Sequence, residues 1–308
     1  MLGRGAAQRL QRDPEAPLLA PEVVEQIQRA DAFLLNLECC ISERGAPFPD
    51  PRKPFFFRAP PIAAKRLKGL GVTAVTLANN HALDFGEAAL LDTLRYLAAA
   101  GIQAVGAGDD EAVARAPQQL LCNEIRVRLV SFCDHPRAYA ASVERPGVAY
   151  ADLSTGLPGW VAEAATPGDD ADLVLVTPHW GPNMVAEPTP PVRRAAQALR
   201  AAGATVIAGH SAHVFQGVAS GVLFDLGDFF DDYAVDRELR NDLGLLWLLE
   251  LDKGGLRALH ALPLVLDYCF TRSAAGEERR WITRRLQQLC APLGTEVVDA
   301  GGLLDILT

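Results

Sequence analysis

The sequence predicts a mixed α/β fold in which two packed, mixed β-sheets are flanked by helices. Strand-like and helix-like segments alternate through the first two thirds of the chain, and from about Arg126 onward strands dominate, several of them placed as antiparallel neighbours. The chain has 308 residues, 49% of them apolar, and no clear linker divides it. We therefore expect one domain over residues 1–308 with a substantial buried core.

Proline and glycine mark the ends of the helices in the alternating part. The segment 60–71, for example, opens with two prolines, which suit the first turn of a helix, and closes with a glycine, which suits its end. The expected helices are 21–30, 60–71, 87–100, the segment that begins at Pro190 and stops at Gly203, and 277–289 near the end of the chain.

Short apolar, β-rich runs give the expected strands. In the alternating part they are 31–37, 71–78, 102–105, 172–178 and 204–209. The β-rich part adds 126–133, 222–224, 244–251 and 256–266. Each helix of the first part leads the chain into the next strand, as expected for an α/β sheet.

Four of these strands end on residues that bind metals. The residues are Glu38, Asn80 with His81, His179, and His210 with His213 three positions later. The chain has only six histidines, and four of them occupy these positions. Because ligands collect beyond the carboxyl ends of strands in open α/β sheets, we expect one metal site here. Imidazole nitrogens with carboxylate and amide oxygens suit one or two divalent ions, Mn, Zn, Fe or Mg.

The charge pattern excludes some classes of partner. The net charge is −9, and lysine and arginine form no sustained run, which argues against nucleic acid as a partner. A small-molecule or polymeric anionic substrate in a metal pocket remains compatible with this charge. Neither a signal-peptide pattern nor a transmembrane stretch is present, so we expect a soluble, cytoplasmic protein as given. The oligomeric state does not follow from the sequence.

The cysteines show no pattern of a disulfide framework or of paired metal ligands. Six are present, without a C-x-x-C pair, which is typical of reduced, buried thiols. Cys39 and Cys40 directly follow Glu38. Either could supply a thiolate to a metal, but we favour small apolar packing residues.

The strand-end motifs, taken in order with their neighbours, resemble the CapA family of poly-γ-glutamate capsule-biosynthesis proteins. The matching runs are NLE at 36–38, LANNHALDFG at 77–86, HWG at 179–181, GHSAHV at 209–214 and LGDF at 226–229. A run at 285–295 resembles the closing helix of the family. The resemblance covers nearly the whole chain and implies a calcineurin-like metallophosphoesterase fold.

The resemblance also implies a role for each strand-end residue. Glu38 matches the carboxylate that bridges two metal ions. Asn80, His179 and His210 match ligands of the second ion, and His213 matches a ligand of the first. His81 would act as general acid and protonate the leaving oxygen.

The start of the chain departs from the family pattern. Members of the family carry a Gly-Asp on the first strand, ahead of a Met-Leu-Gly-Arg-like run, and that aspartate binds the first metal. Here the run is Met1 to Arg4, so the first strand is missing from the sequence as given. Two hypotheses follow: the start codon is assigned too late, or the protein has lost this strand together with the aspartate.

Basic residues in the long irregular segment 39–59 are candidates for contact with substrate. Arg52, Lys53 and Arg58 lie in this segment, which is longer than an ordinary connection. They could meet a phosphate or a carboxylate-rich polymer, or be ordinary solvated charges.

Four further residues near the motifs have open roles. Trp180 could stack on a substrate, although a core or rim aromatic is the better interpretation. Asp228 replaces an asparagine of the family pattern and lies near the expected site. Asp84 could orient His81 or cap the following helix. His135 follows the strand 126–133 and could approach the pocket.

These features predict a metal-dependent hydrolase of the phosphoesterase type that uses a metal-activated water, with a link to capsule or cell-envelope polymers implied by the resemblance. The alternative is a non-catalytic accessory protein that binds an anionic polymer or partner in the same pocket. Hydrolysis of an amide or peptide bond by the same activated water is a third hypothesis.

Overall fold

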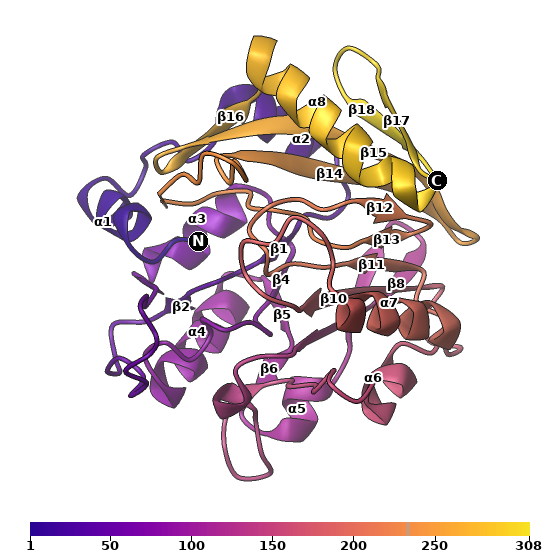
Figure 1. Ribbon diagram of the computed structural model, residues 1–308. Helices are drawn as coiled ribbons and strands as arrows, with labels where there is room; N and C mark the ends of the chain where they lie inside the picture. The colour runs from indigo at the N-terminus through magenta and orange to yellow at the C-terminus, as the bar shows by residue number, and fades with distance from the viewer. Residues whose placement is uncertain (233) are drawn as a thin grey trace.

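The computed structural model describes residues 1–232 and 234–308 and confirms the mixed α/β class (Figure 1). Its β-strands form three main sheets, each associated with helices. No helix in the described part of the chain is long and apolar enough to cross a membrane.

A six-stranded mixed sheet forms one layer. Its strand order is β12 (Val218–Ala219), β13 (Val222–Leu223), β11 (Val206–Ala208), β10 (Leu173–His179), β8 (Ile125–Cys133) and β7 (Gln118–Cys122). The four central strands are parallel, and an antiparallel strand closes each edge. Helices α6 (Gly159–Ala164) and α7 (Pro190–Ala202) pack on one face through a shared apolar cluster. Helix α7 begins and ends as the sequence predicts, because Gly203 adopts a left-handed conformation at φ 114°.

A three-stranded parallel sheet lies beside this layer. Its order is β1 (Leu34–Asn36), β4 (Ala74–Thr76) and β5 (Gln103–Val105). Helices α2 (Pro21–Gln28), α3 (Ile62–Gly69) and α4 (Glu87–Ala99) match three of the expected helices to within a few residues. Helix α1 (Gly5–Arg12) was not expected from the sequence. Ala74 and Val105 of this sheet pack against Val127 and Leu129 of the six-stranded sheet.

The third sheet is antiparallel and is built from the end of the chain. Its order is β14 (Leu243–Asp252), β15 (Gly255–Asp267), β18 (Leu304–Leu307) and β17 (Glu296–Asp299), with β16 (Phe270–Ser273) also paired to β15. Helix α8 (Gly276–Cys290) lies across this sheet (Figure 1). Leu245 and Ile282 share an apolar cluster with Leu223 of the six-stranded sheet, which joins the two layers.

The expected pair of packed sheets is therefore present with one difference. The layer opposite the six-stranded sheet is divided into the parallel and the antiparallel sheets, because β1 pairs only with β4 and β14 only with β15 within the described chain.

The segment 39–59 is anchored at both ends by short strands. β2 (Cys40–Ile41) and β3 (Arg58–Ala59) pair in parallel and hold the intervening residues over the end of the parallel sheet. A second short pair, β6 (Ala107–Gly108) with β9 (Gly147–Val148), supports α5 (Glu111–Arg115) and the η1 turn (Arg137–Tyr139). A short η2 turn (Ala291–Leu293) follows α8.

Candidate metal centre

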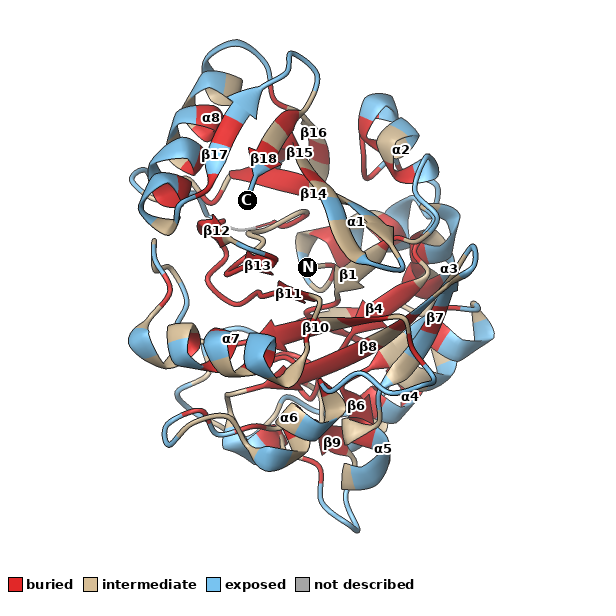
Figure 2. Cartoon of the chain, turned by 90° about the vertical axis from the view of Figure 1, so that its right-hand side faces the viewer, coloured by how far each residue is buried: buried red, intermediate tan, exposed pale blue. Residues whose placement is uncertain are grey.

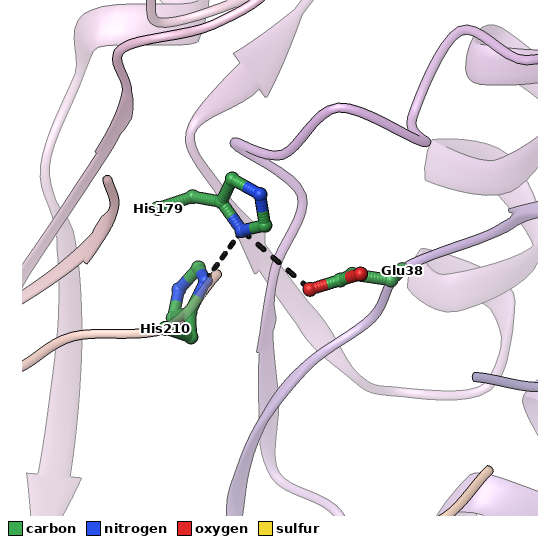
Figure 3. Close-up of side chains that lie close together, drawn as sticks. All are labelled: Glu38, His179 and His210. Atoms are coloured by element: carbon green, nitrogen blue, oxygen red, sulfur yellow. Dashed lines mark hydrogen bonds and ion pairs between the residues drawn. The ribbon is translucent and has the colours of Figure 1, made fainter. Parts of the chain in front are cut away.

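Three buried side chains from three strand ends converge on one point (Figure 3). Glu38 follows β1, His179 ends β10 and His210 follows β11. A ligand atom of each lies within 4.8 Å of those of the other two. His179 Nδ1 lies 2.8 Å from His210 Nδ1 and 3.5 Å from Glu38 Oε1. Three of the residues expected at strand ends therefore lie together.

The sheet explains why the two histidines are neighbours. β10 and β11 are adjacent parallel strands, and the backbone bridge between them continues to His179 and His210. Glu38 reaches the same point from the parallel sheet across the layer, and Asn36 Nδ2 donates to its Oε1 at 2.6 Å. Backbone pairing therefore fixes the positions of His179 and His210, and the Asn36 side chain orients Glu38.

Four side-chain atoms of the strand-end candidates are buried without a hydrogen-bond partner in the described part of the chain. They are Glu38 Oε2, Asn80 Oδ1, His179 Nε2 and His210 Nε2. Such atoms are rare in native proteins because each costs roughly 1–3 kcal/mol of lost hydration. A carboxylate oxygen, an amide oxygen and imidazole nitrogens are all atom types that bind borderline divalent cations.

Burial keeps both histidines in the form that binds metals. Desolvation, followed by the other nearby histidines, lowers the pKa of His179 well below its ordinary value of 6.5. Desolvation lowers the pKa of His210 to about 3. Both imidazoles are therefore neutral at pH 7, and a neutral imidazole has the lone pair that coordinates a cation.

His81 lies in a hydrogen-bond network around Asp84. His81 Nδ1 lies 2.7 Å from Asp84 Oδ2, and the Phe57 backbone N–H donates to the same oxygen at 2.6 Å. Asp84 Oδ1 accepts from the Tyr139 hydroxyl at 3.1 Å and lies 2.9 Å from Lys53 Nζ. Burial lowers the pKa of His81, and the hydrogen bond from Asp84 opposes this effect.

The network decides between the two roles left open for Asp84. The residue is completely buried against His81, whereas helix α4 begins at Gly86 without a side-chain cap. Asp84 therefore orients the His81 ring, and its second oxygen ties the ring to the segment 39–59 through Lys53.

His213 is held differently from His210, although only three residues separate them. Its Nδ1 lies 2.9 Å from Asp228 Oδ1. Burial lowers the pKa of His213, but the charge and hydrogen bond of Asp228, together with Glu38 and Asp225, raise it overall to about 10. Without a bound cation His213 is therefore an imidazolium paired with Asp228.

Asp225 was missed by sequence reasoning. It is fully buried, and it accepts from the backbone N–H groups of Ala212 and Gly227. Burial raises its pKa to about 7. Its place directly after the strand β13 and Phe224 is the same strand-end signal that pointed to Glu38, and it could have been applied here.

One known protein family matches most of the chain. The family described as "Bacterial capsule synthesis protein PGA_cap" matches residues 1–233, about three quarters of the chain. The chain belongs to this bacterial capsule synthesis family. The expected CapA resemblance is thus confirmed.

Two curated members of known sequence are similar to this capsule synthesis family member. A probable polyglutamine synthesis accessory protein of Mycobacterium tuberculosis is 33% identical over 290 residues, covering 87% of this chain and 74% of the relative. The PGA biosynthesis protein CapA of Bacillus subtilis is 32% identical over 177 residues, covering 55% of this chain and 45% of the relative.

Similarity to solved structures is more distant. A putative 5'-nucleotidase from Staphylococcus aureus, crystallised with α-ketoglutarate, aligns with a TM-score of 0.42 and 14% identity. The alignment covers 74% of this chain and 44% of that one.

The three basic residues that were candidates for substrate contact in this family member have different surroundings. The Arg52 side chain is 88% exposed and pairs with Asp50, and the Arg58 guanidinium lies over the Phe85 ring and donates to the backbone oxygen of Arg44. Lys53, between them, turns inward and donates to the Asn80 backbone oxygen at 2.7 Å. Of the three basic residues, Lys53 is the one that contacts Asn80 and Asp84, beside the candidate metal centre.

Trp180 occupies the core, the alternative that the sequence favoured over stacking on a substrate. Its ring is 2% exposed, packs edge-on against Phe132, and donates from Nε1 to the Phe224 backbone oxygen. Both faces of the ring are thus within the molecule.

His135 does approach the pocket. Its ring centroid lies 5.2 Å from that of His179. Asp134 pairs with His135 Nδ1 and also accepts from the Gly181 backbone N–H at 2.9 Å. The adjacent carboxylate therefore orients His135 next to the metal centre.

The cysteines beside Glu38 are not part of the cluster. Cys39 and Cys40 are completely buried, and the metal-binding group found among the described residues does not include them. Desolvation raises the pKa of Cys39 to about 12, so it remains a thiol at neutral pH. The packing interpretation of these residues fits the structure.

Proposed function

We propose that this protein binds a divalent metal ion through Glu38, Asn80, His179 and His210 and hydrolyses a phosphoester of an anionic substrate. The observation that carries the proposal is the set of four buried atoms, one from each residue, that have no hydrogen-bond partner in the described chain. Each of these atoms has a lone pair that a cation could accept, and Mn, Zn, Fe and Mg are the candidates.

The side chains around this group have suitable roles. A bound divalent ion would supply Lewis acidity and lower the pKa of a water molecule. His81, oriented by Asp84, would donate a proton to the leaving oxygen. Lys53 would hold the loop backbone at Asn80 in place. His213 with Asp228 would contribute to a site for a further ion only after the imidazolium loses its proton.

We also propose that residues 1–308 act as one domain. A single apolar cluster in the described chain includes Leu2 and Leu10 from its start and Leu264 and Cys269 from its end, so the two ends share a core.

A second candidate function is that of an accessory protein that binds an anionic polymer without turnover. Two observations favour it: His213 is paired with Asp228, and the M. tuberculosis relative is named an accessory protein. The capsule context of the family points to a carboxylate-rich or phosphorylated polymer for either candidate.

An assay of the purified protein separates the two candidates. The metal-depleted protein is supplied with each of the four ions, and turnover of an aryl phosphate monoester and diester is measured beside metal binding by calorimetry. For the hydrolase we expect His179→Ala to lose metal binding and turnover, and His81→Ala to lose turnover while retaining the metal.

The matched control is His260→Ala. His260 pairs with Asp305 on the antiparallel sheet, outside the cluster, so both activities should persist. Metal binding without turnover of either ester by the unmodified protein would favour the accessory function. Turnover that survives His179→Ala would overturn the proposed centre.

A further inference from the structure

His135 lies beside the candidate metal centre because of the pairing between β8 and β10. These neighbouring parallel strands are buried along most of their length (Figure 2). Cys133 at the end of β8 is the register partner of His179 at the end of β10. His135 follows directly after this strand end, and its ring centroid lies 5.2 Å from that of His179. The strand register therefore places a further imidazole against a proposed metal ligand.

The turn that carries His135 is tied to the end of β10. The Asp134 backbone N–H donates to the His179 backbone oxygen at 3.1 Å, and Asp134 Oδ2 accepts from the Gly181 backbone N–H at 2.9 Å. The Cys133 thiol donates to the His135 backbone oxygen at 2.6 Å. These contacts hold the backbone around His135 in place before a ligand binds, as is needed for a residue that orients a ligand.

Asp134 also determines which ring nitrogen of His135 carries the proton. Asp134 Oδ1 pairs with His135 Nδ1. Because a carboxylate only accepts hydrogen bonds, Nδ1 is the donor of this pair. In the neutral ring Nε2 then has a lone pair and acts as an acceptor. No hydrogen bond joins Nε2 to the described part of the chain, so this acceptor is available to a ligand.

The exposure of His135 distinguishes it from the proposed metal ligands. Its side chain is 35% exposed, whereas Glu38, His179 and His210 are buried. The group of candidate ligands found among the described residues does not include it. His135 thus borders the centre on the side open to solvent, where the alcohol portion of a bound phosphoester would extend. A hydrogen-bond acceptor at this place favours a ligand that carries a donor.

We propose that His135 contacts the substrate through Nε2, which accepts a hydrogen bond from a hydroxyl group, so that the site prefers phosphoesters of hydroxylated alcohols. Both oxygens of Asp134 already accept hydrogen bonds. A neutral hydroxyl group therefore suits Nε2 better than an ammonium group, which needs a counter-charge. This inference rests on the proposed function, because the phosphate lies at the neighbouring centre, and it adds the class of alcohol that the phosphate esterifies.

The test uses two ligands that differ only in hydroxyl groups, propylphosphonate and its dihydroxypropyl counterpart. Phosphoester hydrolysis does not cleave their carbon–phosphorus bond, so calorimetry in the presence of Mn²⁺ measures binding independently of turnover. We expect the unmodified protein to bind the hydroxylated ligand about five- to tenfold more tightly, which corresponds to one hydrogen bond. His135→Phe keeps a ring against His179 but has no acceptor, so the two affinities should become equal.

Further measurements separate ligand contact from packing. The nitrogen NMR signal of His135 Nε2 should shift when the hydroxylated ligand is added and stay unchanged with propylphosphonate. His135→Gln, whose amide oxygen can accept in place of Nε2, should recover part of the preference. His260→Phe is the matched control: His260 pairs with Asp305 on the antiparallel sheet, so this variant should keep the full preference.

Equal affinities of the unmodified protein for the two ligands would overturn the inference. So would the failure of both ligands to bind, or an equal loss of both affinities in His135→Phe. Failure of the proposed function gives a different result, in which aryl phosphates are not turned over while the preference for the hydroxylated ligand remains. His135 would then contact the anionic ligand of a protein that binds without turnover.

Discussion

His210 and His213 lie three residues apart after the same strand, yet their surroundings give them opposite charge states. Burial is the main influence on His210 and lowers its pKa to about 3, whereas Asp228 raises the pKa of the similarly buried His213 to about 10. In the described part of the chain one imidazole has a buried nitrogen without a hydrogen-bond partner, and the other is an ion-paired cation. A histidine at a strand end is thus a candidate metal ligand or a salt-bridge partner depending on what the rest of the fold places against it.

The largest effect predicted by this contrast concerns metal affinity. His210→Ala should weaken binding of the ion proposed at Glu38, His179 and His210 by more than about a hundredfold, because it removes a ligand, which costs more than a supporting contact. His213→Ala should change that affinity much less. Calorimetric titration of both variants measures the difference, and equal losses would show that His213 also binds this ion.

A second prediction concerns the stability of the metal-free protein. Asp228→Asn should destabilise it by roughly 3 kcal/mol at pH 6, because it leaves a buried imidazolium without its counter-charge. The pKa of His213 is about 10 when folded against 6.5 as its ordinary value. The stabilisation is therefore complete below pH 6.5 and is lost as the pH rises through 10.

Urea unfolding of both proteins from pH 6 to 10 checks this dependence. The difference between them should shrink toward pH 10. Asp305→Asn is the matched control, since it breaks a half-exposed pair with His260, and its effect should be small at every pH. A difference that grows with pH would contradict the assigned charge state of His213.

A smaller effect is expected in the Asp84 network. Tyr139→Phe removes one hydrogen bond to a buried carboxylate that keeps its other donors, so a loss of about 1 kcal/mol is expected. Tyr268→Phe, at a 70% exposed position, is the control for the ring substitution. A loss no greater than that of the control would mean that the Tyr139 hydroxyl does not support Asp84.

The smallest effect should come from Arg52. Its side chain is exposed and its partner Asp50 is two residues away, so Arg52→Ala should leave both the unfolding midpoint and metal affinity unchanged. Lys53→Ala should lower the midpoint, because Lys53 lies against the buried Asp84. If Arg52→Ala alters metal affinity, it is wrong that Lys53 points toward the candidate metal centre while Arg52 points into solvent.

The positions that could be predicted from sequence are those that strand geometry fixes. Apolar runs of β character end at Glu38, His179 and His210. Predicting that these residues lie together required only that parallel strands present their carboxyl ends at one place, which they do. The extents of the strands were less accurate: the expected strand 31–37 is only Leu34–Asn36, since pairing rather than composition sets its length.

The rest depended on tertiary contacts that no local pattern encodes. Arg52, Lys53 and Arg58 are equivalent in sequence terms, and only the packing of the segment 39–59 turns Lys53 inward. The pairing of His213 with Asp228 joins residues on two different loops. Trp180 follows a ligand position, yet strand alternation directs it into the core.

The backbone bridge between His179 and His210 has a consequence for how the centre forms. A slip of β11 by one residue along β10 would turn His210 to the opposite face of the sheet, so a single register admits the cluster. The spacing of the two imidazoles is therefore set when the sheet folds, and the conformational entropy of ordering them is lost at that stage. An arriving cation meets a preorganised pair, so its association rate should report dehydration of the ion and entry to the pocket, with little contribution from rearrangement of the protein.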